Sequence, residues 1–347
     1  MHERSPTPNI LGLQVVCVFL GIIGFVAYAV SKFTSGRAIV LITVIGLLGS
    51  LVAFIILARQ LKSMGHIVKA IVISLLAVVL GSYIVLFALI YFFQDAIANK
   101  TSAFFQPRSI SAEAAQALVA SDVEAIHLTT PDGARLSGWL VRNSTQAQSP
   151  LVIYFDGSGS ESSKMIPYAR KLDGWSVALI RYRGFGPSTG TPSQANAFAD
   201  ATLIYDTLSK RPDINSRHIV SMGYSLGTGI AVYLSEQRPV AGTILVSPYG
   251  SMTLAGPKQP PIYAPLSGIM HRYFDSISRV PTINSPMLCL IGSNDWAVPP
   301  ELSLKLAGKW GGQTTIKTYA GEDHSLFLHD NGSWTDILAF LQGIEQK

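Results

Sequence analysis

Residues 218–237 read HIVSMGYSLGTGIAVYLSEQ, and this stretch decides the fold. Its first six residues have the apolar composition of a buried strand, and residues 226–237 have the small and apolar composition of a helix. Between the two, Gly223, Ser225 and Gly227 form the pattern G-x-S-x-G, in which a serine lies on a sharp strand-to-helix turn. Glycines let the strand and the helix approach closely. The stretch therefore predicts an α/β sheet with Ser225 as a candidate nucleophile.

A second match to the same pattern lies at residues 186–190, which read GPSTG. Its context differs, because Gly190 and Pro192 prevent a helix from starting directly after Ser188. We expect residues 183–192 to form a loop, and we assign the nucleophile to Ser225.

A serine nucleophile needs a base, and the base needs an acid that orients it. The expected chain order is serine, acid, histidine, which favours Asp295 and His324, since each follows a predicted strand at the edge of the sheet that carries Ser225. Asp323 is the alternative acid, but it does not directly follow a strand. His329 is expected within the final helix, at the surface. The predicted catalytic residues are Ser225, Asp295 and His324.

Short β-rich runs alternate with helical runs from residue 123 onwards, which is typical of an α/β protein. An antiparallel hairpin is expected at 123–129 and 135–141. The other predicted strands have the apolar character of buried parallel strands: 151–155, 177–182, 218–223, 242–246, 287–292 and 315–319. The predicted helices are 162–172, 194–209, 226–237, 301–307 and 324–342. The fold class is therefore α/β, with an eight-stranded and mostly parallel sheet.

A serine hydrolase holds the oxyanion of its tetrahedral intermediate with two backbone N–H groups. One belongs to the residue after the nucleophile and the other to the loop after the third strand, so the candidates are Leu226 and Ser158. Asp156, in the same loop, would oppose an oxyanion if its carboxylate pointed inward; either it points away or activity is reduced. The loop has no Walker-type phosphate-binding spacing, and we expect neither a metal nor an organic cofactor.

Beyond the nucleophile turn, residues 182–192 (YRGFGPSTGTP) and residues 274–276 (FDS) complete a set of motifs. Over about residues 120–345 the chain resembles the α/β-hydrolase superfamily, in particular membrane-anchored serine hydrolases related to the serine aminopeptidase and prolyl-oligopeptidase groups. The resemblance implies hydrolysis of an ester, thioester or amide. Many relatives carry His-Gly where this chain has Asp156-Gly157.

Three uncharged runs in the first hundred residues are each long enough to cross a bilayer, namely 10–30, 38–58 and 70–93. We expect three transmembrane helices that anchor the chain. A cleaved signal peptide is the alternative for the first run, but its apolar length exceeds a typical signal core. The density of Lys and Arg at 59–69 favours a cytoplasmic position for that connector, which would place the hydrolase domain on the extracytoplasmic side.

The charge distribution excludes a nucleic-acid-binding protein, and the cysteine content excludes a disulfide-rich or cysteine-metal protein. Of the 347 residues only 14% are charged, and residues 1–100 hold seven basic and two acidic side chains. The remaining 247 residues hold 19 of each sign, so no basic face is available for nucleic acid. The two cysteines, Cys17 and Cys289, lie in apolar runs and form neither a disulfide framework nor a metal cluster.

The expected domains are a membrane anchor at 1–97, a connector at 98–121 and a hydrolase domain at 122–347. A proline-rich insertion at about 249–285 interrupts the α/β alternation, and its apolar residues could line an acyl pocket or pack onto the core. These residues are Tyr249, Ile262, Tyr263, Leu266, Ile269, Met270, Tyr273 and Phe274.

We expect a membrane-tethered serine hydrolase whose partner is an acyl or lipid-like small molecule with an ester or thioester bond. A serine peptidase of the same fold is one alternative. A catalytically silent membrane-anchored binding module is another, and the departure at Asp156 keeps it open.

Overall fold

The computed structural model describes residues 104–143, 145–253, 271–329 and 332–346, together with residues 78, 81, 82, 93–96 and 98. The chain divides into two compact units, Met1–Ala103 and Phe104–Lys347. Nearly all of the first unit, including the predicted spans at 10–30 and 38–58 and most of 70–93, lies outside the described residues. Within the described part of the chain, no helix has both the length and the apolarity that crossing a bilayer requires.

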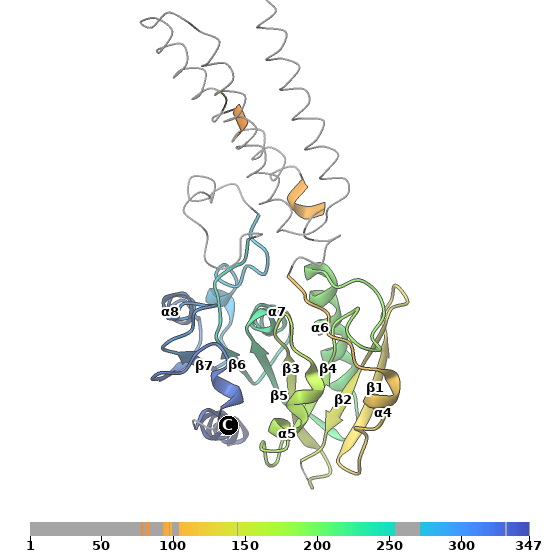
Figure 1. Ribbon diagram of the computed structural model, residues 1–347. Coiled ribbons are helices and arrows are strands. Elements are labelled where there is room, and N and C mark those ends of the chain that lie inside the picture. The colour runs from red at the N-terminus through yellow and green to blue at the C-terminus, as the bar shows by residue number, and fades with distance from the viewer. Residues whose placement is uncertain are drawn as a thin grey trace, which may run out of the picture. The chain divides into compact units, whose positions relative to one another are not determined.

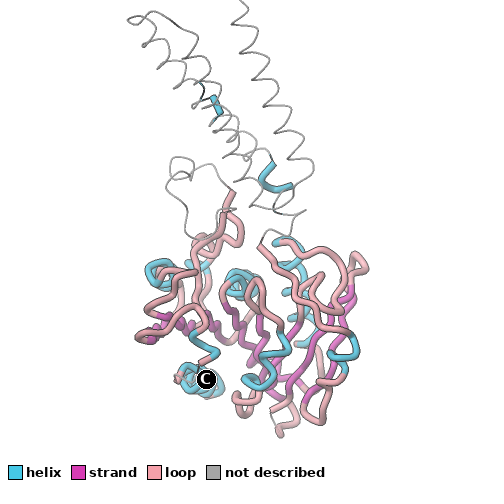
Figure 2. Tube along the Cα trace, viewed as in Figure 1, coloured by secondary structure: helices cyan, strands magenta, loops and turns pink. Residues whose placement is uncertain are grey.

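The second unit contains an eight-stranded sheet (Figures 1 and 2). Its strands are β1 (Val123–Thr129), β2 (Arg135–Val141), β3 (Ser149–Phe155), β4 (Ser176–Ile180), β5 (Ile214–Tyr224), β6 (Gly242–Val246), β7 (Met287–Gly292) and β8 (Thr314–Tyr319). Their order across the sheet is β1-β2-β4-β3-β5-β6-β7-β8. The pairs β1/β2 and β2/β4 are antiparallel and all other neighbours are parallel, which confirms the predicted mostly parallel sheet.

The central strands are buried on both faces. Every residue of β3, β6 and β7 is buried, because helices cover both sides of a parallel sheet. On one face α5 (Ile166–Ala169) and α9 (Ser333–Glu345) contribute to the main hydrophobic cluster with side chains of these strands. Elsewhere α7 (Leu226–Gln237) packs on β3, β5 and β6 and against α6 (Gln194–Leu208) (Figure 1).

The remaining short elements are α4 (Ala112–Gln116), η1 (Ser162–Met165), η3 (Val280–Thr282), α8 (Pro300–Ala307) and η4 (Leu326–Leu328). The predicted helix at 162–172 is thus one short 3₁₀ turn followed by one α turn. The strand predicted at 218–223 is longer than expected, since β5 begins at Ile214.

The helix predicted at 324–342 is wrong at its start. Its place is taken by a loop that holds His324, by η4, and by α9, which begins only at Ser333. Gly332 precedes α9 with a left-handed φ of 83°, a conformation that ends any helix continuing from upstream. Phe327 is buried, and its carbonyl accepts a hydrogen bond from Trp334 Nε1 at 2.6 Å, which links η4 to α9.

Candidate active site

Ser225 lies on the sharp turn between β5 and α7, with φ 51° and ψ −118°. Such a conformation is strained for a residue with a side chain and is often found at functional sites. Two glycines make it possible. A Cβ on Gly227 would lie 2.0 Å from the carbonyl oxygen of Phe155, and a Cβ on Gly223 would lie 2.4 Å from that of Gly227. The sequence thus folds locally into the predicted strand, turn and helix.

Three side chains from distant parts of the chain form one hydrogen-bonded series. Ser225 Oγ lies 2.9 Å from His324 Nε2. His324 Nδ1 lies 2.8 Å from Asp295 Oδ2 and 3.0 Å from Oδ1. The Asp295 side chain is 1% exposed and that of His324 is 19% exposed, so the histidine can reach solvent while the carboxylate cannot.

The Asp295 carboxylate is held by further donors. Its Oδ1 accepts hydrogen bonds from the backbone N–H of Ala297 at 3.0 Å and of Val298 at 2.8 Å. Burial on its own would raise the pKa of Asp295, but the hydrogen bonds from His324 and Val298 outweigh it and hold the pKa below its usual value. Asp295 is therefore an ionised acceptor that can fix the tautomer of His324.

The two loops that carry Asp295 and His324 are joined by backbone contacts. The Asn294 N–H donates to the Glu322 carbonyl at 2.8 Å, and the Gly321 N–H donates to Ser293 Oγ at 2.8 Å. The parallel pairing of β7 with β8 sets this contact, because both strands end at the same edge.

Tyr224, directly before the serine, is a residue whose role the sequence analysis missed. Its Oη donates to the backbone carbonyl of His324 at 3.0 Å, and its ring packs on Phe327 with a centroid separation of 4.6 Å. Burial raises the pKa of Tyr224, so the hydroxyl remains a donor. An aromatic residue in the G-x-S-x-G pattern was the available signal, but its partner is 100 residues away.

The candidate oxyanion donors follow the carboxyl ends of two adjacent strands, β5 and β3. Leu226 is the first residue of α7, and the first N–H of a helix has no intrahelical acceptor. Ser158 lies in the loop after β3, and the pairing of Phe155 with Gly223 brings this loop beside the serine turn. Within the described part of the chain, the Ser158 N–H donates no hydrogen bond.

Asp156 in this loop is turned towards its own strand. Its Oδ1 accepts from Tyr154 Oη at 3.0 Å and from the Gly157 N–H at 2.9 Å, neither of which is a predicted oxyanion donor. Burial raises the pKa of its carboxyl to about 6. The Asp156 carboxylate was expected either to point away from the oxyanion or to reduce activity. These contacts favour the first alternative.

The competing residues have other partners. Asp323 accepts from the Ser325 N–H at 2.8 Å and from Ser325 Oγ at 2.6 Å. The prediction that His329 lies within the final helix is wrong, because His329 directly follows η4. Its Nδ1 lies 2.6 Å from Glu322 Oε2, and its side chain is 49% exposed. No group of His, Cys, Asp or Glu in the described ranges is arranged to hold a metal ion.

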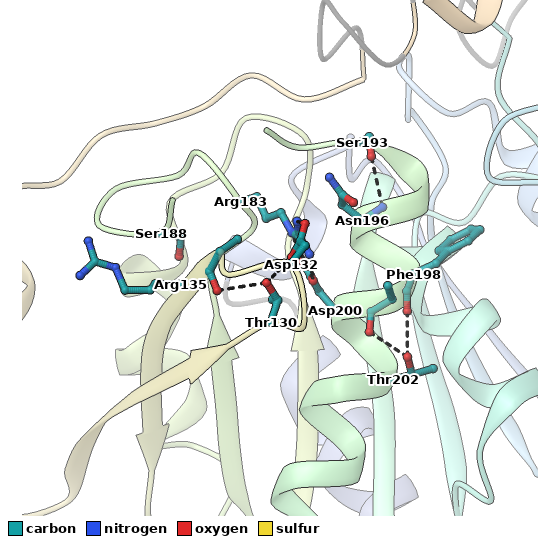
Figure 3. A network of polar contacts seen from close by, with 12 residues as sticks. Thr130, Asp132, Arg135, Arg183, Ser188, Ser193, Asn196, Phe198, Asp200 and Thr202 are labelled. Atoms are coloured by element: carbon teal, nitrogen blue, oxygen red, sulfur yellow. Dashed lines mark hydrogen bonds and ion pairs between the residues drawn. The ribbon is translucent and has the colours of Figure 1, made fainter. Parts of the chain in front are cut away.

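Ser188, from the second G-x-S-x-G match, is buried in a loop. Its Oγ accepts from the Ser137 N–H at 3.0 Å and donates to the Arg181 carbonyl at 3.3 Å. Figure 3 shows this loop, in which Arg183 lies against Asp132 and Asp200. These contacts connect the loop to β2, to the turn between β1 and β2, and to α6.

The described part of the insertion packs into the domain. Tyr249 is fully buried and its Oη donates to the Leu226 carbonyl at 3.1 Å. Tyr273 pairs with Met252 in an antiparallel bridge, and Phe274 is 1% exposed. These aromatic residues pack onto the core. The other five pocket candidates, Ile262, Tyr263, Leu266, Ile269 and Met270, lie outside the described residues.

Comparison with known proteins gives consistent matches. Residues 146–278 match the family model described as "Serine aminopeptidase, S33". An uncharacterized Mycobacterium tuberculosis protein is 35% identical over 179 residues, which cover 51% of this chain and 63% of that protein. The α/β-hydrolase domain-containing protein WAV2 of Arabidopsis thaliana is 29% identical over 195 residues, covering 51% of this chain and 63% of its own length.

Two further similarities concern a lipase and an esterase. The lysophosphatidylserine lipase ABHD12 of Danio rerio is 29% identical over 184 residues, which cover 47% of this chain and 48% of that protein. A Pyrococcus furiosus esterase has a similar fold, with a TM-score of 0.54, 18% identity, and coverage of 69% of this chain and 99% of the esterase. The matched region spans less than two thirds of the relatives compared by sequence. From its sheet, its serine turn and these matches, the chain belongs to the α/β-hydrolase superfamily.

Proposed function

We propose that this protein is a serine hydrolase that cleaves carboxylic esters or thioesters of acyl or lipid-like substrates through an acyl-enzyme. The observation that carries the proposal is the hydrogen-bonded series Ser225, His324 and Asp295, with the serine on a strained turn. A nucleophile, a base within reach and a carboxylate that orients the base are the parts that acyl transfer needs.

In the proposed reaction Ser225 Oγ attacks the substrate carbonyl while His324 Nε2 takes the hydroxyl proton. Asp295 keeps the proton of His324 on Nδ1 and stabilises the imidazolium. The N–H groups of Leu226 and Ser158 bind the oxyanion of the tetrahedral intermediate. The intermediate collapses as the bond to the leaving group breaks, and His324 returns its proton to that group. A water molecule, deprotonated by His324, then attacks the acyl carbon. The bond from that carbon to Ser225 Oγ breaks, and His324 returns the proton to Oγ, which releases the acid and the free serine.

The comparisons bear on the choice between an ester and an amide substrate. Their printed names include a lysophosphatidylserine lipase and an esterase, which supports acyl esters. The description of the matching family as a serine aminopeptidase supports the peptidase alternative. The same three residues could serve either reaction, because the triad chemistry is shared.

A substrate panel tests the class. We expect the full chain in detergent to hydrolyse medium and long p-nitrophenyl acyl esters with higher kcat/KM than the acetyl ester, and to cleave aminoacyl p-nitroanilides more slowly than any ester. Faster cleavage of the anilides would support the peptidase. Absence of turnover together with absence of fluorophosphonate labelling would support the silent binding module.

We also propose that residues 1–97 tether the domain to a membrane, with the domain on the extracytoplasmic side. The support is the three uncharged runs and the basic connector at 59–69. The chain should remain in the membrane pellet after alkaline carbonate extraction. In sealed right-side-out vesicles protease should reach the domain; a protected domain would contradict the proposed side.

A further inference from the structure

The segment 104–110 precedes α4 without forming a helix or strand and lies against the candidate oxyanion loop. The Gln106 N–H donates to the Ser158 carbonyl at 2.7 Å. Arg108 Nε donates to the Gly159 carbonyl at 3.0 Å. Two successive carbonyls of the oxyanion loop are therefore bound by this segment, which we call the strap.

The strap is itself fixed to the loop that follows β4. The Gly186 N–H donates to the Arg108 carbonyl at 3.1 Å. Phe105 is 5% exposed and packs edge-on against Tyr182, with ring centroids 5.3 Å apart. Tyr182 Oη in turn donates to the Asp156 carbonyl at 2.6 Å. The strap thus also reaches the start of the oxyanion loop through one intervening side chain.

These contacts surround the peptide that carries the Ser158 N–H. That peptide joins Gly157 to Ser158, and the peptides on both sides have carbonyls, those of Asp156 and Ser158, held by hydrogen bonds. Glycines at 157 and 159 would otherwise allow the loop many backbone conformations. An oxyanion donor is effective only if it already points at the position where negative charge develops.

We propose that the strap is a positioning element that orients the Ser158 N–H for oxyanion binding, with the Gln106 N–H as its main contact. The proposal rests on the proposed function, since it assigns a role within the same site. Its physical basis is that the strap removes the conformational freedom that two glycines give to the loop.

The test compares Gln106→Pro with Gln106→Ala in the full chain. Proline removes the backbone donor, whereas alanine keeps it and removes only the side chain. We expect Gln106→Pro to lower kcat per phosphonate-titrated site by about tenfold or more, with KM changed by less than about twofold, because a lost oxyanion donor costs about 10² to 10³ in kcat. Gln106→Ala should remain within about twofold of wild type.

A transition-state analogue supplies a readout that a merely structural role would not change. An alkyl trifluoromethyl ketone forms a tetrahedral oxyanion on the serine, so its inhibition constant should rise by the same factor as kcat falls. A variant that only loses folded protein would have fewer titrated sites, with an unchanged kcat per site and an unchanged inhibition constant. That result would overturn the proposal.

Arg108→Ala provides a second variant if Gln106→Pro fails to fold, with exposed Arg217→Ala as its matched control. We expect kcat per site to fall by about threefold or more for Arg108→Ala, and no change for the control. If every folded strap variant keeps kcat per site within about twofold, the strap proposal is wrong while the proposed function stands. If wild-type protein is not labelled at Ser225, both proposals fail.

Discussion

Two serines of this chain lie in the same sequence pattern, yet their surroundings differ in kind. Ser225 follows a buried strand and precedes a helix, has a positive φ, and lies 2.9 Å from a histidine ring. Ser188 lies in a loop, and its hydroxyl is bound to backbone groups of Ser137 and Arg181. The comparison teaches that the pattern G-x-S-x-G has chemical meaning only when a strand and a helix flank it.

Replacing each serine by alanine tests the comparison most directly. Ser225→Ala should lower kcat by about 10⁵-fold or more and abolish fluorophosphonate labelling, because the triad acts as a unit. Ser188→Ala should keep labelling per folded molecule and lower the free energy of unfolding by about 1 to 2 kcal/mol, since the Ser137 N–H loses its acceptor and the Arg181 carbonyl loses a donor. The comparison would be reversed if labelling survived in the first variant and vanished in the second.

The two neighbouring carboxylates, Asp295 and Asp323, sharpen the assignment around Ser225. Asp295→Asn should lower kcat by about 10⁴-fold, because an amide favours the wrong tautomer of His324. Asp323→Asn is the matched control and should change kcat by less than about threefold, as its carboxylate binds Ser325. Steady-state kinetics on an ester, together with a thermal melt of each variant, checks both. Equal losses would show that Asp323 shares the orienting role.

A buried ion pair stabilises the loop around Ser188. Arg183 Nη2 lies 2.8 Å from Asp200 Oδ1, and both side chains are less than 10% exposed. Asp200→Ala leaves the guanidinium with only the largely exposed Asp132, so the free energy of unfolding should fall by about 3 kcal/mol or more.

Kinetics and urea denaturation of Asp200→Ala distinguish an effect on stability from an effect on catalysis. Because Asp200 does not contact the triad, kcat per titrated site should stay within about threefold of wild type. Asp132→Ala should lower the free energy of unfolding by less than Asp200→Ala does, when both variants are measured by urea denaturation. A large loss of kcat per site in folded Asp200→Ala would contradict this expectation, because it would mean that the loop around Ser188 affects catalysis at Ser225.

Asp156, the buried carboxyl in the candidate oxyanion loop, differs from Asp200 in having no cation among its hydrogen-bond partners. Burial raises its pKa from 3.8 to about 6, so the native state holds this proton more tightly than the unfolded state does. The resulting stability is fully present below about pH 4 and is lost as pH rises through 6, by about 3 kcal/mol in all.

Asp156→Asn should remove that dependence. Relative to wild type, the variant's free energy of unfolding should increase between about pH 4 and about pH 6 and level off above that range, as measured by urea denaturation at each pH. Parallel pH profiles for the two proteins would mean that the carboxyl titrates at its ordinary pKa.

Apolar runs and turn residues in the sequence predict the strand bounds well, but they do not predict where the final helix begins. The strands at 123–129, 135–141, 242–246 and 287–292 have the predicted bounds, since apolar runs with clear turn residues define them. The final helix was misplaced because the apolar residues Leu326 and Phe327 continue its pattern, although they belong to a separate 3₁₀ turn. A left-handed glycine interrupts the helix, and sequence periodicity does not detect it.

The contacts around the site were predictable only where chain order constrains them. The pattern predicts Ser225, Asp295 and His324 because each follows a strand at the same sheet edge, and the structure brings the three together. The contact of Tyr224 with the His324 carbonyl and that of Gln106 with Ser158 were not predicted. Both use backbone groups of irregular segments, and nothing in the residue types indicates their partners.

The hydrogen bond between Ser225 and His324 joins residues 99 positions apart in the chain. During synthesis β5 and α7 leave the ribosome well before β8, so a nascent chain contains the serine without its base. Contacts of such long sequence separation also form slowly in folding. The proposed hydrolytic activity should therefore emerge only when the last strand has paired. In refolding, recovery of activity would time the pairing of β7 with β8 rather than the collapse of the core.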